Sequence, residues 1–322
     1  MQIASLQFKA RAGAKLADVK LQAALRKLQG NFVKGRADRM LELDNFDAIR
    51  DAAAAIRNRT LANLDVYLET FERNATAGGA VVHNNAGAAA LAVVLVLGNR
   101  RGWPREAMPP HNLPFTILGT GILWFGWFGF NAGSALGANG LAAQALVNTH
   151  LAAATAMLSW LVVEKLRSGH ATSLGAASGA VAGLVAITPC AGFVGGMAPV
   201  AIGAVAGAVC YLALRLKTKF GFDDSLDVIA VHLVGGLLGA LLLGLFADTK
   251  VNALGFDGLF FGGGTDLLVD QVVASAATLA FSFGVTFVVA KILNATMGIR
   301  VSTEDELVGL DQSQHAESAY QA

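Results

Sequence analysis

The sequence predicts an all-α protein, a polytopic membrane helix bundle of about seven spans that follows a soluble helical N-terminal segment. The first observation is the charge content, 15% of the 322 residues, whereas an ordinary soluble domain carries about 25%. The second is its distribution. Residues 1–75 hold 13 basic and 9 acidic side chains, and residues 76–322 hold only 11 and 14. The first part therefore has the composition of a soluble module, and the second part that of a protein embedded in lipid.

Five stretches of the second part lack Asp, Glu, Lys and Arg for at least 20 residues each. They are residues 74–99, 107–163, 168–214, 228–247 and 271–290. A bilayer core of about 30 Å needs roughly 20 apolar residues of helix, so each stretch is long enough to cross it. The two longest stretches are expected to hold two helices each, because glycine-rich breaks interrupt them at 137–140 and 192–196.

Seven helices are therefore expected in the second part. Their predicted ranges are 76–98, 114–136, 141–163, 174–192, 197–214, 226–247 and 268–292. The motif GAVAG occurs at 179–183 and 203–207, and Gly235 and Gly239 repeat its spacing. Small residues four apart allow helices to pack closely in lipid. A buried core of a soluble protein is the alternative, but seven apolar helices leave too little polar surface to cover them.

Basic residues indicate how these helices are oriented. Lys and Arg are frequent in the connections 99–113, 164–173 and 215–225 and after the last helix, whereas 137–140 and 193–196 have none and 248–267 has one. By the positive-inside rule the basic connections and the C-terminus are cytoplasmic. The predicted location is the cell (inner or plasma) membrane.

The first predicted helix conflicts with this orientation, because seven spans and a cytoplasmic C-terminus would place residues 1–75 outside. The N-terminal sequence lacks the apolar core of a signal peptide. We therefore expect residues 1–75 to stay cytoplasmic and 76–98 not to span as a simple helix. His83, Asn84 and Asn85 would otherwise face lipid, at a cost of about a few kcal/mol for each unsatisfied group. His83 would then be unable to pair with a second histidine.

The N-terminal segment is predicted to contain two helical stretches, at residues 4–30 and 45–73. The second repeats apolar residues at spacings of three and four, as an amphipathic helix does. Two solvated helices that dock on each other are favoured over a membrane-surface role, because the charge is mixed rather than a basic stripe. The predicted organisation is a soluble segment (1–75), a transmembrane domain (76–300) and a cytoplasmic tail (301–322).

Charge and cysteine content exclude several classes of function. The formal net charge of +1 lacks the basic excess of a nucleic-acid-binding protein. Cys190 and Cys210 are the only cysteines, and both lie in apolar runs. A disulfide framework, a cysteine-ligated zinc site and an iron–sulfur cluster are therefore not expected. We expect no metal site and no cofactor.

Polar groups at bilayer depth are costly and therefore mark candidate functional positions. His83 lies in GGAVVHNNAG and His232 in DVIAVHLVGG. An imidazole can donate and accept a hydrogen bond and can relay a proton, although a single histidine bonded between helices would have only a structural role. The aromatic run from Trp124 to Phe130 is followed by Asn131 and Ser134. It suits either an interfacial belt or a pore mouth whose aromatic faces hold a cation.

Four segments together resemble the ammonium transporter (Amt/Mep/Rh) family. They are GWFGFNAGSA, LGAASGAVAGLVAITP, DDSLDVIAVH and the tail RVSTEDELVGLD. The similarity runs from about residue 78 to 320 and follows the family's order. It implies a homotrimer in the lipid bilayer with a pore in each subunit that conducts ammonium or ammonia, and it implies a transporter rather than an enzyme.

The resemblance also implies roles for pore residues. His83 and His232 match the family's paired pore histidines, which hydrogen-bond in mid-membrane. Phe130 matches one of two stacked phenylalanines that gate the outer mouth, and Ser134 matches the hydroxyl of the outer ammonium site. Trp127, one helical turn before Phe130 in the aromatic run, is assigned to the same pore.

Two further features are assigned by the same resemblance. Asp224 falls on the acidic position that starts the tenth family helix, where a structural role as an N-cap and a functional role are equally expected. The tail from Val301 resembles the cytoplasmic segment that meets the PII nitrogen-signalling protein.

The match departs from the family at its start. The family has eleven spans, and the similarity begins only at the fifth, so we expect the first four to be lacking and transport to be impaired. Residues 5–79 instead resemble the N-terminus of lactate-utilisation iron–sulfur proteins, which suggests a fusion near residues 75–83. Besides an impaired transporter, the alternatives are a non-transporting membrane remnant and a soluble redox subunit. The missing cysteine clusters and the apolar spans disfavour the redox subunit.

Overall fold

The computed structural model describes residues 79–318. The chain divides into two units, residues 1–75 and 76–322, and the described residues belong to the second. The helices predicted at 4–30 and 45–73 lie outside the described residues. Within 79–318 the regular elements are helices, without a strand, as the predicted all-α class requires.

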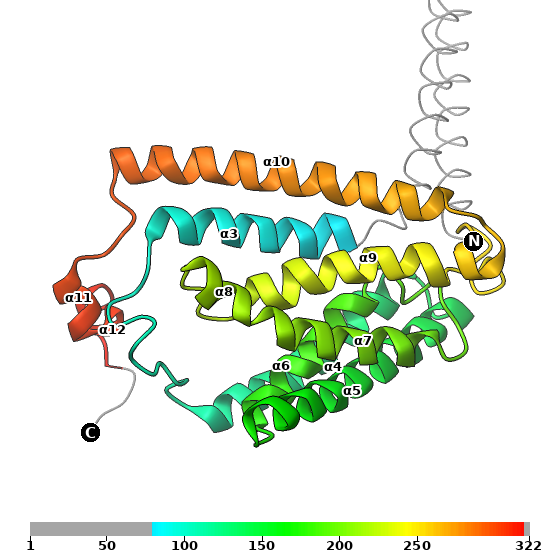
Figure 1. Cartoon of the computed structure of the whole chain (residues 1–322), viewed down its shortest axis with the longest axis horizontal. Helices are drawn as coiled ribbons and strands as arrows, with labels where there is room; N and C mark the ends of the chain where they lie inside the picture. Colours follow the sequence, from blue (N-terminus) through cyan, green and yellow to red (C-terminus); the bar gives the residue numbers. More distant parts are fainter. Residues whose placement is uncertain (1–78, 319–322) are drawn as a thin grey trace, which may run out of the picture. The chain divides into compact units, whose positions relative to one another are not determined.

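The main helices follow the predicted order (Figure 1). They are the π-helical turn η2 (Gly79–Asn84), α3 (Asn85–Leu97), α4 (Leu113–Gly133), α5 (Gly140–Ser168), α6 (Ser173–Ile187), α7 (Ala198–Ala213), α8 (Arg215–Phe220), the π-helical turn η3 (Ile229–Val234), α9 (Gly235–Phe246), the short 3₁₀ helix η4 (Leu259–Phe261) and α10 (Asp266–Thr296). Two short helices, α11 (Thr303–Val308) and α12 (Leu310–Ser313), form the tail.

Five helical segments are long and apolar enough to cross a membrane. They are Leu113–Gly133, Gly140–Ser168, Ala198–Phe220, Ile229–Phe246 and Asp266–Thr296. Two shorter apolar helices, Val82–Leu97 and Ser173–Ile187, complete the set. These seven apolar helices coincide with the seven predicted ones, and the protein has the predicted architecture of a polytopic membrane bundle.

Helix α6 ends five residues before its predicted end, at Ile187 rather than at residue 192. Pro189 explains the early end, because proline has no backbone N–H to continue the helix and its ring clashes with the carbonyl four residues earlier. The non-helical residues that follow are largely buried, with Cys190 and Val194 fully inaccessible. Their carbonyls are partly satisfied by Asn148 of α5, whose side-chain nitrogen donates to the carbonyls of Ala191 and Val194. Irregular backbone at membrane depth is tolerated where protein buries it in this way.

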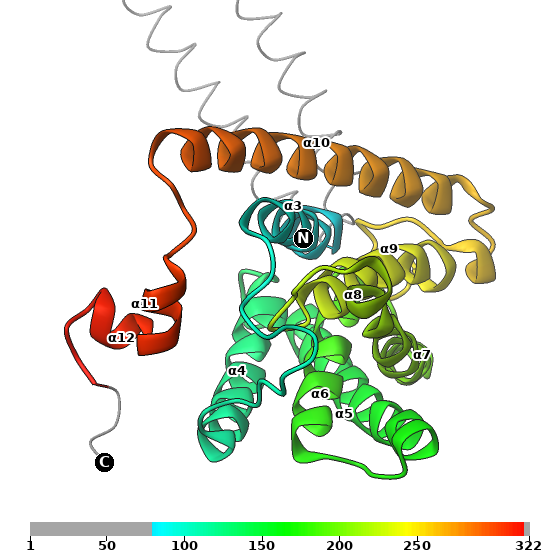
Figure 2. The ribbon, with the colours of Figure 1, turned by 60° about the vertical axis from the view of Figure 1, so that its left-hand side comes forward.

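Helix α5 is at the centre of the packing and contacts α6 and α7 most extensively. The two GAVAG motifs lie at these contacts. A methyl group added at Gly183 of α6 would come 2.6 Å from the Ala156 Cβ atom, and one at Gly207 of α7 would come 2.9 Å from the Ala156 carbonyl carbon. Both glycines are therefore needed for the close approach of two helices to α5. On the opposite side of the bundle, α10 lies along α3 and α9 (Figure 2).

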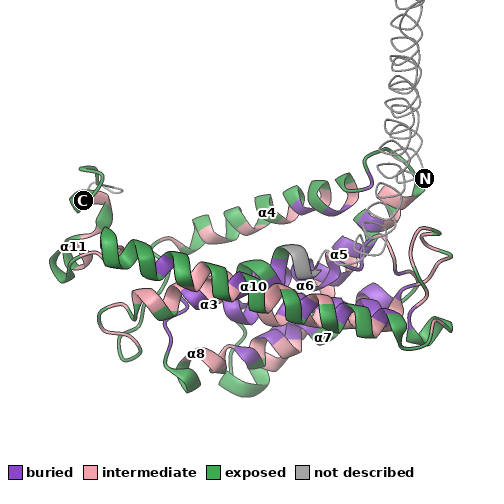
Figure 3. Ribbon diagram, turned by 90° about the horizontal axis from the view of Figure 1, so that it is seen from above, coloured by how far each residue is buried: buried purple, intermediate pink, exposed green. Residues whose placement is uncertain are grey.

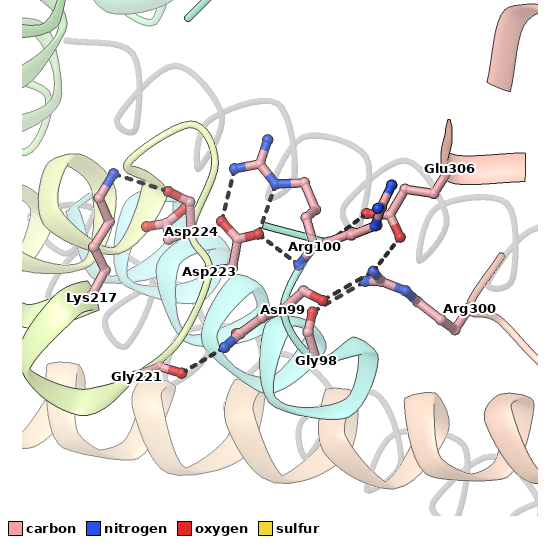
Figure 4. Close-up of polar contacts among 10 residues, drawn as sticks. Gly98, Asn99, Arg100, Lys217, Gly221, Asp223, Asp224, Arg300 and Glu306 are labelled. Atoms are coloured by element: carbon pink, nitrogen blue, oxygen red, sulfur yellow. Dashed lines mark hydrogen bonds and ion pairs between the residues drawn. The ribbon is translucent and has the colours of Figure 1, made fainter. Parts of the chain in front are cut away.

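The connections at the two ends of the bundle differ in charge. At one end, the segments after α3, before η3 and after α10 meet through Arg100, Asp223 and Arg300 (Figure 4). At the other end, the segment after α9 meets the one after α6, where the Asp248 amide donates to the Phe193 carbonyl over 2.9 Å. The basic connections adjoining these helices thus lie at one end, which is the arrangement that the positive-inside rule requires. The side of the membrane that each end faces stays a prediction.

Helices α4 and α10 expose long apolar surfaces (Figure 3). Phe125 on α4 is 77% exposed, and Phe281 on α10 is 72% exposed. Only Trp127 and Asn131 of α4 are buried. Surfaces of this kind are compatible with contact with lipid or with another apolar helix rather than with water.

Candidate functional site

Each of the two predicted pore histidines lies on a π-helical turn. His83 is in η2 and His232 is in η3. Turns of this type are rare and are frequent at functional sites. In both cases a regular α-helix, α3 or α9, follows the turn directly. The two histidines therefore share a local backbone that their sequences, AVVHNN and IAVHLV, do not predict.

The structure brings the two histidines into contact. The Nδ1 atoms of His83 and His232 are 3.2 Å apart, although 149 positions separate them in the sequence. A hydrogen bond between two Nδ1 atoms requires one imidazole to donate and the other to accept. The rings are 5.3 Å apart between centroids and tilted by 35°. His83 is almost completely buried, with 2% of its surface exposed.

Two glycines allow the helices of this pair to cross closely. Gly87 follows His83 by four residues, and Gly236 follows His232 by four residues. A Cβ atom at Gly236 would lie 2.8 Å from the His83 Cβ atom, and one at Gly87 would lie 2.6 Å from the Leu233 Cα atom. Each histidine turn thus packs against the glycine on the partner helix. The contact is reciprocal and sets the separation of the two rings.

The polar patch next to His83 is partly satisfied within the described residues, although the Asn84 side-chain oxygen is buried without a hydrogen-bond partner. The Asn84 side-chain nitrogen donates to the Ser275 hydroxyl over 3.1 Å, and the Ser282 hydroxyl donates to the Asn85 carbonyl over 2.8 Å. Both serines belong to α10. The expectation that His83 would be unable to pair was therefore wrong, because α9 and α10 provide the surface that buries His83 and Asn84. The side chain of Asn85 is exposed, as expected for that residue.

Aromatic side chains of α4 cover the histidine pair. The Trp127 ring stacks on the His83 ring at 5.5 Å with an interplanar angle of 11°. The Phe130 ring meets His83 edge-on at 6.4 Å and Trp127 edge-on at 5.5 Å. Trp127 is buried, whereas Phe130 is 41% exposed. Four of the predicted site residues therefore form one cluster.

The position of Trp127 depends on a residue that the sequence analysis did not identify. The Trp127 indole nitrogen donates to the Thr188 hydroxyl over 3.0 Å, and that hydroxyl donates to the Leu184 carbonyl over 2.7 Å. Thr188 is the residue that ends α6 before Pro189. The sequence did hold a signal for Thr188. Its hydroxyl lies in an uncharged run, and a polar group inside the membrane needs a hydrogen-bond partner.

Ser134 and Asp224 lie outside this cluster. The Ser134 hydroxyl donates to the Phe130 carbonyl over 2.6 Å, one turn back on its own helix, and the residue is exposed. Asp224 is buried just before η3, the turn that carries His232. Its carboxylate accepts hydrogen bonds from the amides of Val228 and Ile229 at 3.0 and 2.7 Å. These contacts satisfy the first amides of that helix, so Asp224 acts as an N-terminal cap.

Within the described part of the chain, the histidine pair leaves a buried polar atom without a hydrogen-bond partner. The Nε2 atom of His83 is buried and has no hydrogen-bond partner among the described residues. An unpartnered polar atom at this depth is costly, so a ligand able to donate or accept a hydrogen bond would be favoured there. Within residues 79–318 no group of three or more His, Cys, Asp or Glu side chains is placed to hold a metal ion.

Comparison with known proteins identifies the family. The sequence pattern of the Ammonium Transporter Family matches residues 59–320. This chain belongs to the ammonium transporter family. The match reaches back beyond residue 78, where the recognisable motifs begin.

Individual relatives agree with this assignment. The ammonium transporter of Mycobacterium tuberculosis (strain H37Rv) is 53% identical over 249 residues, which are 76% of this chain and 52% of the relative. The ammonium transporter Amt1 of Archaeoglobus fulgidus is 50% identical over 244 residues, 76% of this chain and 61% of the relative. The crystal structure of Saccharomyces cerevisiae Mep2 superposes with a TM-score of 0.66 and 39% identity, covering 71% of this chain and 53% of Mep2.

The chain spans between half and about three fifths of the length of these ammonium transporter relatives. The family is one of transporters and not of enzymes, so the soluble redox subunit is not favoured. The predicted resemblance of residues 5–79 to lactate-utilisation proteins concerns a part that lies almost wholly outside the described residues and stays a prediction.

Proposed function

We propose that the chain moves ammonium or ammonia across the cell membrane along a path lined by His83, His232, Trp127 and Phe130. The contact of 3.2 Å between the two histidines carries the proposal. A hydrogen-bonded imidazole pair presents a polar surface in an otherwise apolar helix crossing, and neutral imidazole can both donate to and accept from a small amine. Membership of the ammonium transporter family supports ammonium as the substrate.

The aromatic residues are assigned to selection at the mouth of the path. The partly exposed Phe130 ring and the stacked Trp127 ring can hold a cation over their faces. Ser134, one turn beyond, would assist through its hydroxyl oxygen, which keeps acceptor capacity while the hydroxyl donates to Phe130. Asp224 is assigned a structural part in this path, as the cap of the helix that bears His232.

We expect transport by this chain alone to be weak. Phe130 is 41% exposed and Ser134 is exposed in the isolated subunit, so the mouth is not enclosed by the described residues. A homotrimer is expected from the family resemblance. The proposed organisation is a soluble segment (1–75), a transmembrane domain (76–300) and a cytoplasmic tail (301–322).

A PII-type signalling protein is the proposed partner of the tail. Arg300 pairs with Glu306 of α11 at 2.7 Å and also donates to the carbonyls of Gly98 and Asn99 (Figure 4). Glu306 in turn accepts from the Arg101 amide. The tail is thereby held against the connection that follows α3, where a bound protein would reach the helix of His83. Removal of residues 301–322 is expected to abolish binding of a PII-type protein to membranes that contain the chain.

Uptake of labelled methylammonium by membrane vesicles containing the full chain tests the transport proposal. His83→Ala and His232→Ala are expected to remove uptake, whereas His170→Ala, which replaces an exposed histidine between α5 and α6, is the matched control. Equal uptake by the parent and the His83→Ala variant would refute the proposed path. Absence of uptake in the parent would favour a non-transporting membrane protein.

A further inference from the structure

An ion pair joins the two helices that carry the histidines, far from the histidines themselves. Arg100 lies three residues after α3, which continues from the turn of His83. Asp223 lies six residues before η3, which contains His232. The two residues meet at the end of the bundle where α3 ends and the helix of His232 begins (Figure 4).

The contact between them is unusually complete. The Asp223 Oδ2 atom accepts from the Arg100 backbone amide at 2.9 Å and from its Nε atom at 2.7 Å. The Oδ1 atom accepts from Nη2 at 2.8 Å. A two-point contact between guanidinium and carboxylate fixes direction as well as distance. Only 2% of the Asp223 side chain is exposed, whereas 40% of the Arg100 side chain is exposed.

A second hydrogen bond joins the same two segments. The Asn99 side-chain nitrogen donates to the Gly221 carbonyl over 3.2 Å. The connection after α3 is therefore attached at two consecutive residues to the connection that leads into η3. Because Arg100 contributes both its backbone and its side chain, a shorter side chain would leave the buried carboxylate with the amide contact alone.

Asp224, the residue after Asp223, connects this ion pair to the helix of His232. Asp224 accepts from the Val228 and Ile229 amides and so fixes where that helix begins. His232 follows three residues after Ile229. Arg100 thus binds Asp223, and the adjacent Asp224 binds the first amides at the start of η3, so Arg100 is connected to η3 by direct contacts. The two helices therefore have two separate contacts, this one and the reciprocal packing at Gly87 and Gly236.

We propose that Arg100 is a positioning residue for the histidine pair, which holds η3 in register with η2 by binding Asp223. This inference rests on the proposed function of the pair in transport. Arg100 touches neither histidine, so its effect reaches them only through the placement of the two helices. A shift of about 1 Å in the placement of reacting groups costs up to roughly a hundredfold in rate in enzymes.

The test uses the full chain in membranes, with histidines labelled by ¹⁵N. Magnetisation exchange between the Nδ1 atoms of His83 and His232 reports their contact without requiring transport, and the signals are assigned by single histidine substitutions. The parent is expected to show this exchange signal. Arg100→Gln is expected to lose it and to lower the maximal rate of methylammonium uptake by about tenfold or more, with the half-saturation concentration unchanged.

Two further variants separate positioning from folding and from charge. The exchanged pair Arg100→Asp with Asp223→Arg is expected to recover the signal and the uptake at least in part, whereas Asp223→Arg alone is not. Arg105→Gln removes a charge from an exposed residue of the same connection and is expected to change neither. If Arg100→Gln does not reach the membrane, Arg100→Lys replaces it, since lysine keeps the charge but not the two-point contact.

An exchange signal of parental strength in Arg100→Gln, or in Arg100→Lys where that variant is used, would overturn the inference. A missing signal in the parent would also overturn it. If the parent shows the signal but takes up no methylammonium, the transport proposal fails, and the response of the signal to Arg100→Gln still decides whether Arg100 positions the pair.

Discussion

Gly236 lies directly against His83. A Cβ atom at Gly236 would be 2.8 Å from the His83 Cβ atom and 2.6 Å from the Asn84 side-chain oxygen. Real Cβ atoms essentially never approach so closely, and Asn84 is itself fully buried. A side chain at position 236 would therefore push the turn that carries His83 away from the helix of His232.

Gly236→Ala is accordingly expected to separate the histidine pair. Overpacking of this kind costs about 1–3 kcal/mol, and here the displaced group is the proposed site. Uptake of methylammonium should fall strongly while the protein is still inserted in membranes. Gly129→Ala on α4 is the matched control, because a Cβ atom there meets nothing within 4 Å. Equal loss of uptake in both variants would contradict the expected role of Gly236.

Thr188→Val is expected to destabilise the protein by removing the acceptor for Trp127. The indole nitrogen would then be left without its partner, and an orphaned buried donor costs about 1–3 kcal/mol. Thr188→Ser keeps the hydroxyl and should behave like the parent. Thermal unfolding in detergent, followed by the fluorescence of the tryptophans, measures the difference. A Thr188→Val protein that unfolds at the parental temperature would show that Trp127 does not depend on this bond.

The contribution of Asp223 to stability is expected to depend on pH only in acid. The Arg100 side chain, which hydrogen-bonds the carboxyl, lowers the pKa of Asp223 below its usual value. A carboxyl with a lowered pKa in the folded protein stabilises it fully above the unfolded pKa of about 3.9, and this contribution is lost as the pH falls through the folded pKa. The difference in unfolding temperature between the parent and Asp223→Asn should therefore be constant from about pH 7 to 5 and shrink below about pH 4. A difference that already shrinks between pH 7 and 6 would contradict this assignment.

Labelling from outside the cell should reach the connection between α9 and α10 but not the basic connections. Phe261→Cys is suited as the outer probe because Phe261 is 44% exposed, whereas a cysteine at the neighbouring Gly262 would be strained at its φ of 93°. Ser168→Cys and Thr218→Cys are the inner probes. The native Cys190 and Cys210 are buried, so they should contribute little background. The reverse pattern of labelling would show that the charge distribution is not a guide to orientation here.

The sequence by itself determined the number, order and approximate bounds of the apolar helices. Runs without charge are a local property, and the bilayer requires them wherever a helix crosses. The same reasoning singled out His83 and His232, because a polar side chain inside such a run stands out without knowledge of its neighbours. The glycine spacing in the GAVAG motifs likewise predicted close packing before its partner, α5, was known.

Only the tertiary structure decided what these residues meet. The contact between His83 and His232 joins positions 149 apart, and it depends on how two helices cross, for which no local pattern exists. The expectation that His83 and Asn84 would lack partners failed for this reason, since the serine that accepts from Asn84 lies on α10, 191 residues later. The side chain of Asn85 is exposed, as expected. Thr188 was overlooked because a hydroxyl in an uncharged run indicates that a partner is needed without indicating which one, and Arg100 because an arginine in a basic connection is ordinary in sequence. They acquire a specific role only when folding places Trp127 and Asp223 within hydrogen-bonding distance.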